Sequence, residues 1–280
     1  MSLPRYSSAF CAEGHLLCPL GRDHRGARHS SLPDKQKCCL LKPMTENPNA
    51  AATTEDFEFA ALAEAKNYRQ ALFAEFGDFL QGQVIEVGAG IGQMTELLTT
   101  LPKVRRALAI EPDTAFCAQH RARFPNHELL EGTVADVPAE TTCDAILSIN
   151  VLEHIHEDEA ELKRYAGLLL PRHGTLCLFV PARPEIYAPI DKDFGHFRRY
   201  TRTELRSKLN RAGFTVARHH YFNVVGYFAW WLNFCALKKR TFEVAKVRFF
   251  DRRIFPAVHA FESRILRPPF GQSLLAVARA

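Results

Sequence analysis

The sequence lacks a hydrophobic run long enough to cross a membrane. The uncharged stretch Phe222–Leu237 has 16 residues and contains Asn223 and Asn233, whereas a spanning helix needs about 20 consecutive, mostly apolar residues. No apolar segment of adequate length follows a basic start near the N-terminus, so a secretory signal is not indicated. These absences predict a cytoplasmic protein.

Paired CxxC spacings are also missing. The chain has eight cysteines, but the spacing of Cys11, Cys18, Cys38 and Cys39 matches no zinc pattern. The cysteines at 117, 143 and 177 lie in or beside apolar runs, which indicates buried free thiols in a reducing cytosol. We therefore expect no metal site.

The net charge of +5 is not spread evenly. Residues 1–43 carry +4 and residues 237–267 carry +6, which leaves about −5 for the remainder. Because the basic residues lie outside the predicted catalytic region, no nucleic-acid partner is expected.

Periodicity divides the chain into three parts. Residues 1–55 contain five prolines and no sustained period, which predicts a disordered leader; a transit peptide is disfavoured by its acidic residues, and Met44 is an alternative start. Residues 56–221 and 268–280 predict one α/β domain. Residues 222–267 do not follow the alternation of strands and helices seen in this domain. They predict a helical insertion of two helices before the last strand.

Within the α/β domain, apolar segments of strand length alternate with helices. Strands are predicted at Gln83–Val87, Arg106–Glu111, His127–Leu130, Cys143–Ile149, Thr175–Val180, Phe214–Tyr221 and Ser273–Ala278. Helices are predicted from Phe57 to about Leu80, and at Gly92–Leu101, Asp113–Phe124, Glu157–Leu170 and Thr201–Ala212. This alternation is typical of a parallel, doubly wound, Rossmann-like sheet with helices on both faces.

A glycine-rich turn follows the first predicted strand, in the segment Val84-Ile-Glu-Val-Gly-Ala-Gly-Ile-Gly92. Glycines here let a nucleoside ligand approach the backbone at the strand ends. Gln93 occupies the position of the third glycine of the dinucleotide fingerprint, which weakens an NAD interpretation. Glu86 would repel a pyrophosphate but suits a cationic ligand, so charge favours S-adenosylmethionine (SAM) over NAD.

Polar residues also end the next strands. They are Glu111, Asp136 and Asn150, the last in Asp144-Ala-Ile-Leu-Ser-Ile-Asn-Val-Leu-Glu-His154. With the glycine turn, this ordered set resembles the successive motifs of class I SAM-dependent methyltransferases over residues 57–220 and 268–279. The resemblance implies a seven-stranded sheet with an antiparallel last strand.

It also implies roles for individual residues. Glu86, Gly88, Ala89 and Gly90 would surround the methionine part of SAM, and Glu111 with Pro112 would bind the ribose. Asp136 and Val137 would lie at the adenine, and Asn150 and Val151 would border the sulfonium. Tyr68 would either close over the cofactor or be a core aromatic residue.

The segment 181–201 follows the fifth strand and carries many functional groups. Its Gly-His-x-Arg-Arg-Tyr run is similar to one in a bacterial subgroup of these methyltransferases. Arg198 and Arg199 could clamp an anionic acceptor group with Asp191 and Tyr200 beside them, or the charges could form a structural network. His154 and His196 are candidate general bases.

Residues 222–267 allow two interpretations. They form a lid with aromatic residues lining an acceptor pocket, which we favour, or an interfacial helix that gives peripheral membrane contact through Trp230, Trp231 and Lys238–Arg240.

The sequence thus predicts methyl transfer from SAM to a small-molecule or lipid-linked acceptor. An NAD-type oxidoreductase and a non-catalytic SAM-fold binding module are the alternatives. The acceptor atom and the oligomeric state cannot be derived from the sequence.

Overall fold

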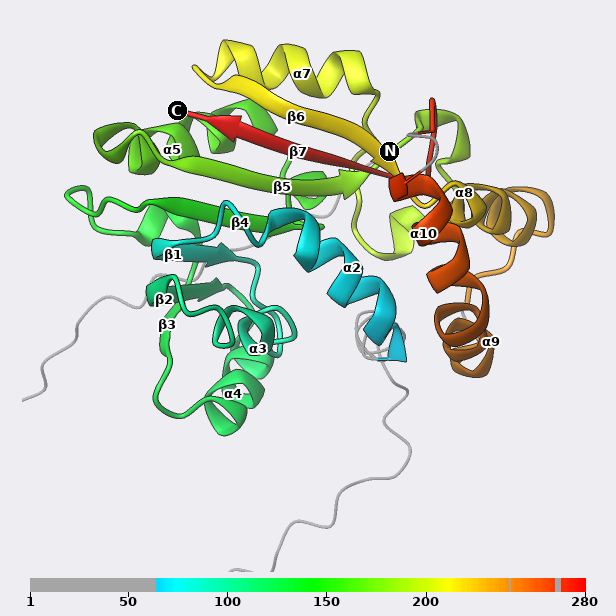
Figure 1. The fold of residues 1–280 in the computed structure, drawn as a ribbon, viewed down its shortest axis with the longest axis horizontal. Helices are drawn as coiled ribbons and strands as arrows, with labels where there is room; N and C mark the ends of the chain where they lie inside the picture. Colours follow the sequence, from blue (N-terminus) through cyan, green and yellow to red (C-terminus); the bar gives the residue numbers. More distant parts are fainter. Residues whose placement is uncertain (1–63, 242, 265–267) are drawn as a thin grey trace, which may run out of the picture. The chain divides into compact units, whose positions relative to one another are not determined.

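A computed structural model of the chain describes residues 64–241, 243–264 and 268–280. The predicted leader, residues 1–55, lies outside these ranges. Seven strands form one sheet (Figure 1): β1 Gly82–Val87, β2 Val104–Glu111, β3 Glu128–Glu131, β4 Ala145–Ile149, β5 Thr175–Pro181, β6 Thr215–Phe222 and β7 Ser273–Arg279.

The strand order is β3-β2-β1-β4-β5-β7-β6. Strands β1 to β5 are paired in parallel, and β7 runs antiparallel to both β5 and β6. The predicted doubly wound, seven-stranded sheet with an antiparallel last strand is confirmed. The strand order reverses between β1 and β4, and the carboxyl ends of strands at such a switch point form a ligand crevice.

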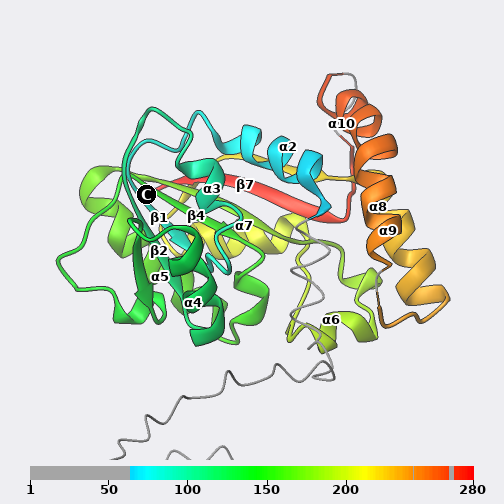
Figure 2. The same cartoon turned by 90° about the horizontal axis from the view of Figure 1, so that it is seen from below.

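Helices cover both faces of the sheet (Figure 2). The helices outside the insertion are α2 Lys66–Phe76, α3 Thr95–Leu98, α4 Thr114–Arg123, α5 Asp158–Leu169, α6 Pro189–Asp193 and α7 Arg202–Arg211. Helices α5 and α7 pack on one face through Leu162, Tyr165 and Leu205, and α2 packs on the other through Leu72 and Phe76. These apolar residues recur every three or four positions, and that spacing gives each helix one buried side.

Two predicted helices are shorter in the structure. Helix α2 ends at Phe76, and Gly82, predicted to end it, instead begins β1 with a φ of 68°. The helix predicted at Gly92–Leu101 was wrong in extent, since α3 spans only Thr95–Leu98. Residues 90–94 form turns after the glycines rather than a regular helical turn.

The insertion contains two helical runs. The first is α8 Val224–Trp230 with the π-helical η5 Trp231–Ala236, and the second is α9 Val244–Phe249, η6 Phe250–Ile254 and α10 Phe255–Arg264. Phe222, predicted to begin the insertion, belongs to β6. The runs lie beyond the carboxyl end of β5 (Figure 1). In the described ranges, no helix is both long and apolar enough to cross a membrane.

A carboxylate attaches the second run to α2. Asp251, 2% exposed, accepts hydrogen bonds from the backbone amides of Asn67 (3.1 Å) and Tyr68 (2.8 Å). Both amides belong to the first turn of α2, where backbone donors have no partner within the helix. Asp251 therefore caps α2 and fixes Tyr68 beside the carboxyl ends of the strands.

Candidate active site

The glycine turn after β1 has the backbone geometry that the sequence predicted. Gly88 has a φ of 71°, and a Cβ there would lie 2.3 Å from Cγ2 of Val151. Any side chain at this position would collide with the loop after β4 and strain the backbone. Glu111, the last residue of β2, holds this turn in place, because its Oε2 accepts a hydrogen bond from the Gly90 amide at 2.8 Å.

A cavity of about 340 Å³ opens beside this turn, and we call it the strand-end cavity. The ends of β1, β2 and β4 contribute Glu86–Ala89, Glu111–Asp113 and Ile149–Val151 to its lining. Of the predicted site residues, the following line it: Tyr68, Glu86, Gly88, Ala89, Glu111, Pro112, Asn150, Val151 and His154.

Glu86 is a buried carboxyl group in this cavity, 3% exposed. Burial, with a smaller contribution from nearby Glu111, raises its pKa to about 8. The Thr95 hydroxyl donates to Glu86 at 2.6 Å and lies 3.0 Å from Nε2 of His120. Because the hydroxyl has one hydrogen, His120 donates to it in turn. When Glu86 is ionised, a cationic ligand in the cavity would neutralise its negative charge.

The residues present fit SAM better than a dinucleotide. Two acidic side chains, Glu86 and Glu111, line the cavity, and a Cβ added at Gly88 or Gly92 would clash with a neighbouring side chain. SAM carries a sulfonium and an ammonium group, whereas a pyrophosphate would meet like charge.

Three predicted cofactor residues do not line this cavity. Gly90 contacts Glu111 through its backbone amide. Val137 is buried in the core, and the exposed Asp136 turns back to accept from the Thr133 amide and hydroxyl at 2.8 and 2.9 Å. Its Oδ2 thus caps the short helix η1 Val134–Asp136, and the adenine contact predicted for Asp136 stays a prediction.

Other lining residues were missed by the sequence reasoning. Phe116 lies in the first turn of α4, five residues after Glu111, and Gln93 and Met94 follow the glycines. Arg69 follows Tyr68 on α2 and is the residue that brings a guanidinium to the cavity. Burial lowers the pKa of Arg69. Its place beside Tyr68 on a helix gave no sequence signal, because surface arginines are common on helices.

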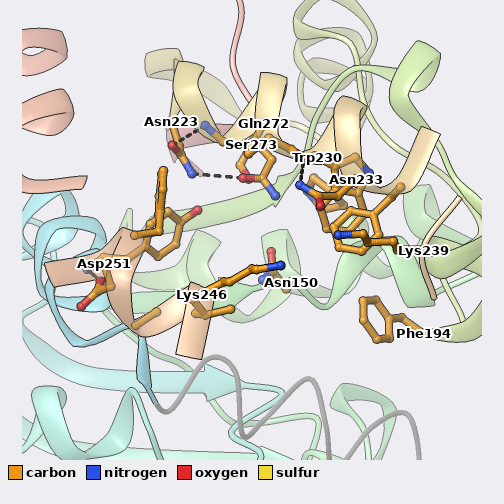
Figure 3. A pocket seen from close by; sticks show the side chains of 18 of the residues that line it. Asn150, Phe194, Asn223, Trp230, Asn233, Lys239, Lys246, Asp251, Gln272 and Ser273 are labelled. Carbon is orange, nitrogen blue, oxygen red and sulfur yellow. Dashed lines mark hydrogen bonds between the residues drawn. The ribbon is translucent and has the colours of Figure 1, made fainter. Parts of the chain in front are cut away.

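A second cavity, of about 430 Å³, lies between the sheet and the inserted helices; we call it the insertion cavity. Tyr68, Asn150 and Phe194 line both cavities. Asn150 has a φ of 52°, a conformation that Asn tolerates better than most residues. Figure 3 shows side chains from the inserted segment, including Trp230, Asn233, Lys239 and Lys246, around the same cavity as Asn150.

Tyr68 joins the core and the cavities. Its ring lies 5.4 Å from that of Phe222 and 5.1 Å from that of Phe255. Burial raises the pKa of its hydroxyl. The two interpretations given for Tyr68 are therefore compatible, since one side packs in the core and the other faces both cavities.

The loop after β5 is organised around Asp191, which is fully buried. Its Oδ1 accepts from Nε of Arg199 at 2.8 Å and lies 3.0 Å from Nδ1 of His196, and its Oδ2 accepts from the Ala188 amide at 2.8 Å. His196 and Arg199 line the insertion cavity, whereas Asp191 is not among the described residues that do so. Asp191 thus positions the two cavity residues.

Arg198 and Tyr200 point into a different network. Arg198 pairs with Asp158 at 2.8 Å, and the Tyr200 hydroxyl donates to the same carboxylate at 2.9 Å. Lys208 also pairs with Asp158, at 2.7 Å. Among the described residues lining either cavity, neither Arg198 nor Tyr200 is present. Their contacts match the structural network that the sequence left open, and an acceptor contact is not supported for them.

The two candidate histidines lie together where the cavities meet. The ring centres of His154 and His196 are 4.7 Å apart, with the rings edge to face. His154 lines the strand-end cavity and His196 the insertion cavity. Desolvation and the neighbouring His196 lower the pKa of His154 to about 4, so it is neutral at pH 7.

Comparison with known proteins was consistent with this geometry. The family model described as a methyltransferase domain matches residues 59–219. A protein of Mycolicibacterium smegmatis named "probable S-adenosylmethionine-dependent methyltransferase" is 27% identical over 60% of this chain and 67% of its own length. One of Mycobacterium tuberculosis with a similar name is 29% identical over 47% of this chain; the chain spans 48% of that relative.

Solved structures share the fold at low sequence identity. A SAM-dependent methyltransferase from Mesorhizobium loti aligns with a TM-score of 0.53 at 14% identity, over 75% of this chain and 96% of its own. A SAM-dependent methyltransferase from Archaeoglobus fulgidus aligns with a TM-score of 0.51 at 14% identity, over 81% of this chain and 97% of its own. At such identity the likeness concerns the fold alone.

Proposed function

This chain belongs to the class I SAM-dependent methyltransferases, and on that premise we propose that it methylates an acceptor with an apolar body held in the insertion cavity. The observation that carries this proposal is the common wall of the two cavities. Tyr68, Asn150 and Phe194 face both, so a cofactor in one and an acceptor in the other would meet at these residues.

The strand-end cavity is the proposed cofactor site. When bound, SAM supplies a methyl group already activated by the sulfonium, so the main task of the protein is to hold the reactants in line. Glu86 would meet the ammonium group and Arg69 the carboxylate of the methionine part. Glu111 would bind the ribose while it holds the Gly90 amide.

The insertion cavity supports an acceptor with an apolar body and a polar nucleophile. Phe194, Trp230, Phe234, Phe249 and Phe250 supply aromatic walls. Polar groups also line it, among them His196, Arg199 and Asn150. The nucleophile would face Asn150 and the two histidines, and we place the activation of the acceptor at His154 and His196.

The inserted segment supports the lid interpretation through its inward face. Trp230 and Phe234 are 6% and 5% exposed, and the Trp230 indole donates to the carbonyl of Ile186 at 3.0 Å. The outward face carries Phe228, Trp231 and Leu232, which are about half exposed. A small molecule and a lipid-linked group share the required chemistry, and the outward face would suit delivery from a membrane surface.

Two assays test the proposal. Isothermal titration should show micromolar SAM binding and no NADH binding, and Glu111→Ala should weaken the SAM affinity. Incubation with [methyl-³H]SAM and bacterial extract, followed by partition between butanol and water, should transfer label to the organic phase for a lipid-linked acceptor or to the aqueous phase for a small one. SAM binding without label in either phase would favour the non-catalytic binding module, and absence of SAM binding would contradict the enzyme proposal.

A further inference from the structure

Three side chains of metal-ligand type converge where the two cavities meet. Glu153 and His154 belong to η2 (Leu152–His154) after β4, and His196 lies after α6. One ligand atom from each can be chosen so that all three lie within 4.8 Å of one another. Glu153 and His196 line the insertion cavity and His154 the strand-end cavity.

A hydrogen bond to Asp191 fixes the orientation of the His196 ring. Its Nδ1 lies 3.0 Å from Oδ1 of Asp191. Because that carboxylate accepts, Nδ1 carries the hydrogen, and in the neutral ring Nε2 presents a lone pair. A carboxylate behind a histidine is the arrangement that orients metal-ligating imidazoles.

The Nε2 lone pair is buried and faces the other ligands. The His196 side chain is 6% exposed, and Nε2 has no hydrogen-bond partner among the described residues. Oε1 of Glu153 lies 4.0 Å from this nitrogen. A buried nitrogen acceptor that faces a carboxylate needs a cation or a proton between them.

Charge also favours a cation. Glu153 and Asp191 contribute two negative charges, and Arg199, paired with Asp191 at 2.8 Å, contributes one positive charge. The carboxylates therefore exceed the guanidinium by one negative charge, which a bound cation would offset. The guanidinium stacks on Trp230 and also interacts electrostatically with Glu153.

We propose that Glu153, His154 and His196 bind one divalent first-row transition metal of the Zn²⁺ type. Two imidazoles and one carboxylate favour such a metal over Mg²⁺ or Ca²⁺, which prefer oxygen ligands. Ligands about 2.0–2.1 Å from a tetrahedral metal lie roughly 3.4 Å apart, so the side chains would close slightly. His154, the exposed member of the three, can rotate to do so. The site departs from the sequence expectation of no metal.

Three protein ligands leave a coordination position open at the junction of the cavities. An acceptor hydroxyl bound there would lose its proton more easily, because a metal lowers the pKa of a bound oxygen ligand. This role rests on the proposed function, whereas metal binding itself does not.

The test is titration of the chelator-treated full chain with Co²⁺, followed by visible absorbance and metal analysis. One Co²⁺ per chain is expected, with the affinity reduced at least about tenfold in His154→Ala, His196→Ala and Glu153→Gln. The matched control is His156→Ala, because this exposed histidine lies two residues from His154 and outside the cluster; its affinity should equal that of the unaltered chain. Far-UV circular dichroism and thermal unfolding of each variant show whether the protein remains folded.

Absence of stoichiometric Co²⁺ binding, or binding that His196→Ala leaves unchanged, would overturn the metal site and indicate that a proton lies between Glu153 and His196. Methyl transfer that persists at full rate after chelation would overturn the role toward the acceptor. Failure of SAM to bind while Co²⁺ still binds through these three residues would contradict the proposed function but not the metal site.

Discussion

The guanidinium of Arg199 lies 4.3 Å from the centre of the Trp230 ring. This contact joins the loop after β5 to the first inserted helix, and it forms part of the wall of the insertion cavity. The insertion is therefore attached to the α/β domain through a residue that also pairs with Asp191.

Trp230→Ala should lower the free energy of unfolding by about 3–5 kcal/mol, since removal of a buried aromatic side chain leaves a void. SAM affinity should change little, because Trp230 does not line the strand-end cavity. Urea unfolding and SAM calorimetry measure the two quantities. Trp231→Ala is the matched control: that ring is 49% exposed, and its loss should cost no more than about 0.5 kcal/mol. Equal destabilisation by both variants would contradict the packing described here.

SAM affinity should rise with pH up to about pH 8. Glu86 has a pKa raised to about 8, so at pH 7 it is largely protonated in the free protein, and it must lose its proton to pair with the ammonium group. Below about pH 8 the Kd should therefore fall by up to about tenfold per pH unit, and at higher pH it should rise again, because the α-ammonium group of SAM loses its own proton near pH 8. Calorimetry between pH 6 and pH 9 measures this. Glu86→Gln should bind more weakly and without that fall in Kd; a fall that persists in this variant would assign the titration to another group.

Arg69→Ala should weaken SAM binding by roughly 10- to 100-fold, the range expected when about 1.5–3 kcal/mol of charged hydrogen bonding is lost. The reason is the proposed pairing of the guanidinium with the methionine carboxylate. Decarboxylated SAM provides the control ligand, since it lacks that group and should bind the variant and the unaltered protein equally. A similar loss for both ligands would show that Arg69 supports the cavity rather than the carboxylate.

His196→Ala should reduce methyl transfer by at least about 100-fold, a typical contribution of an activating group, while the SAM Kd stays nearly unchanged. His196 lines the insertion cavity and not the strand-end cavity. Single-turnover rates with labelled SAM and calorimetry separate the two effects. Loss of SAM affinity in parallel with the rate would remove His196 from the acceptor site.

Arg198→Ala should leave the KM for the acceptor unchanged and cost about 1 kcal/mol of stability or less, as is typical of partly exposed ion pairs. Asp158 would keep Lys208 and the Tyr200 hydroxyl as partners. Steady-state kinetics and thermal unfolding measure both values. An increase in KM without a loss of stability would place Arg198 at the acceptor after all.

The fold and the cofactor were predictable because their signals are local. A buried strand that leads into Gly88, Gly90 and Gly92 carries its own backbone requirement, and Glu86 adds a carboxyl group that suits a cationic ligand. The ends of β1, β2 and β4 then follow from the alternation of strands and helices, since parallel strands place their carboxyl ends at one edge of the sheet. The adenine contact of Asp136 stays a prediction, because the sequence did not indicate that its carboxylate would also cap a short helix through Thr133.

Other parts of the site depend on contacts between distant segments. Arg198 and Arg199 are adjacent and chemically alike, yet one pairs with Asp158 and the other with Asp191. Their sequence contains no information on which of them faces a cavity, because neighbouring side chains in an irregular loop point in directions set by packing. The convergence of Glu153 and His154 with His196 has the same origin, since about 40 residues separate them along the chain.

The sequence by itself determined the order of strands and helices, the glycine turn, the charge of the cofactor site and hence the preference for SAM, because each depends on residues close together in the chain or on the regular geometry of a parallel sheet. Only the tertiary structure decided that the inserted helices wall a second cavity, that Tyr68, Asn150 and Phe194 face both cavities, and that Asp191 orients His196. Those relationships arise from side-chain packing between segments far apart in sequence, and packing is settled only when the whole core is assembled.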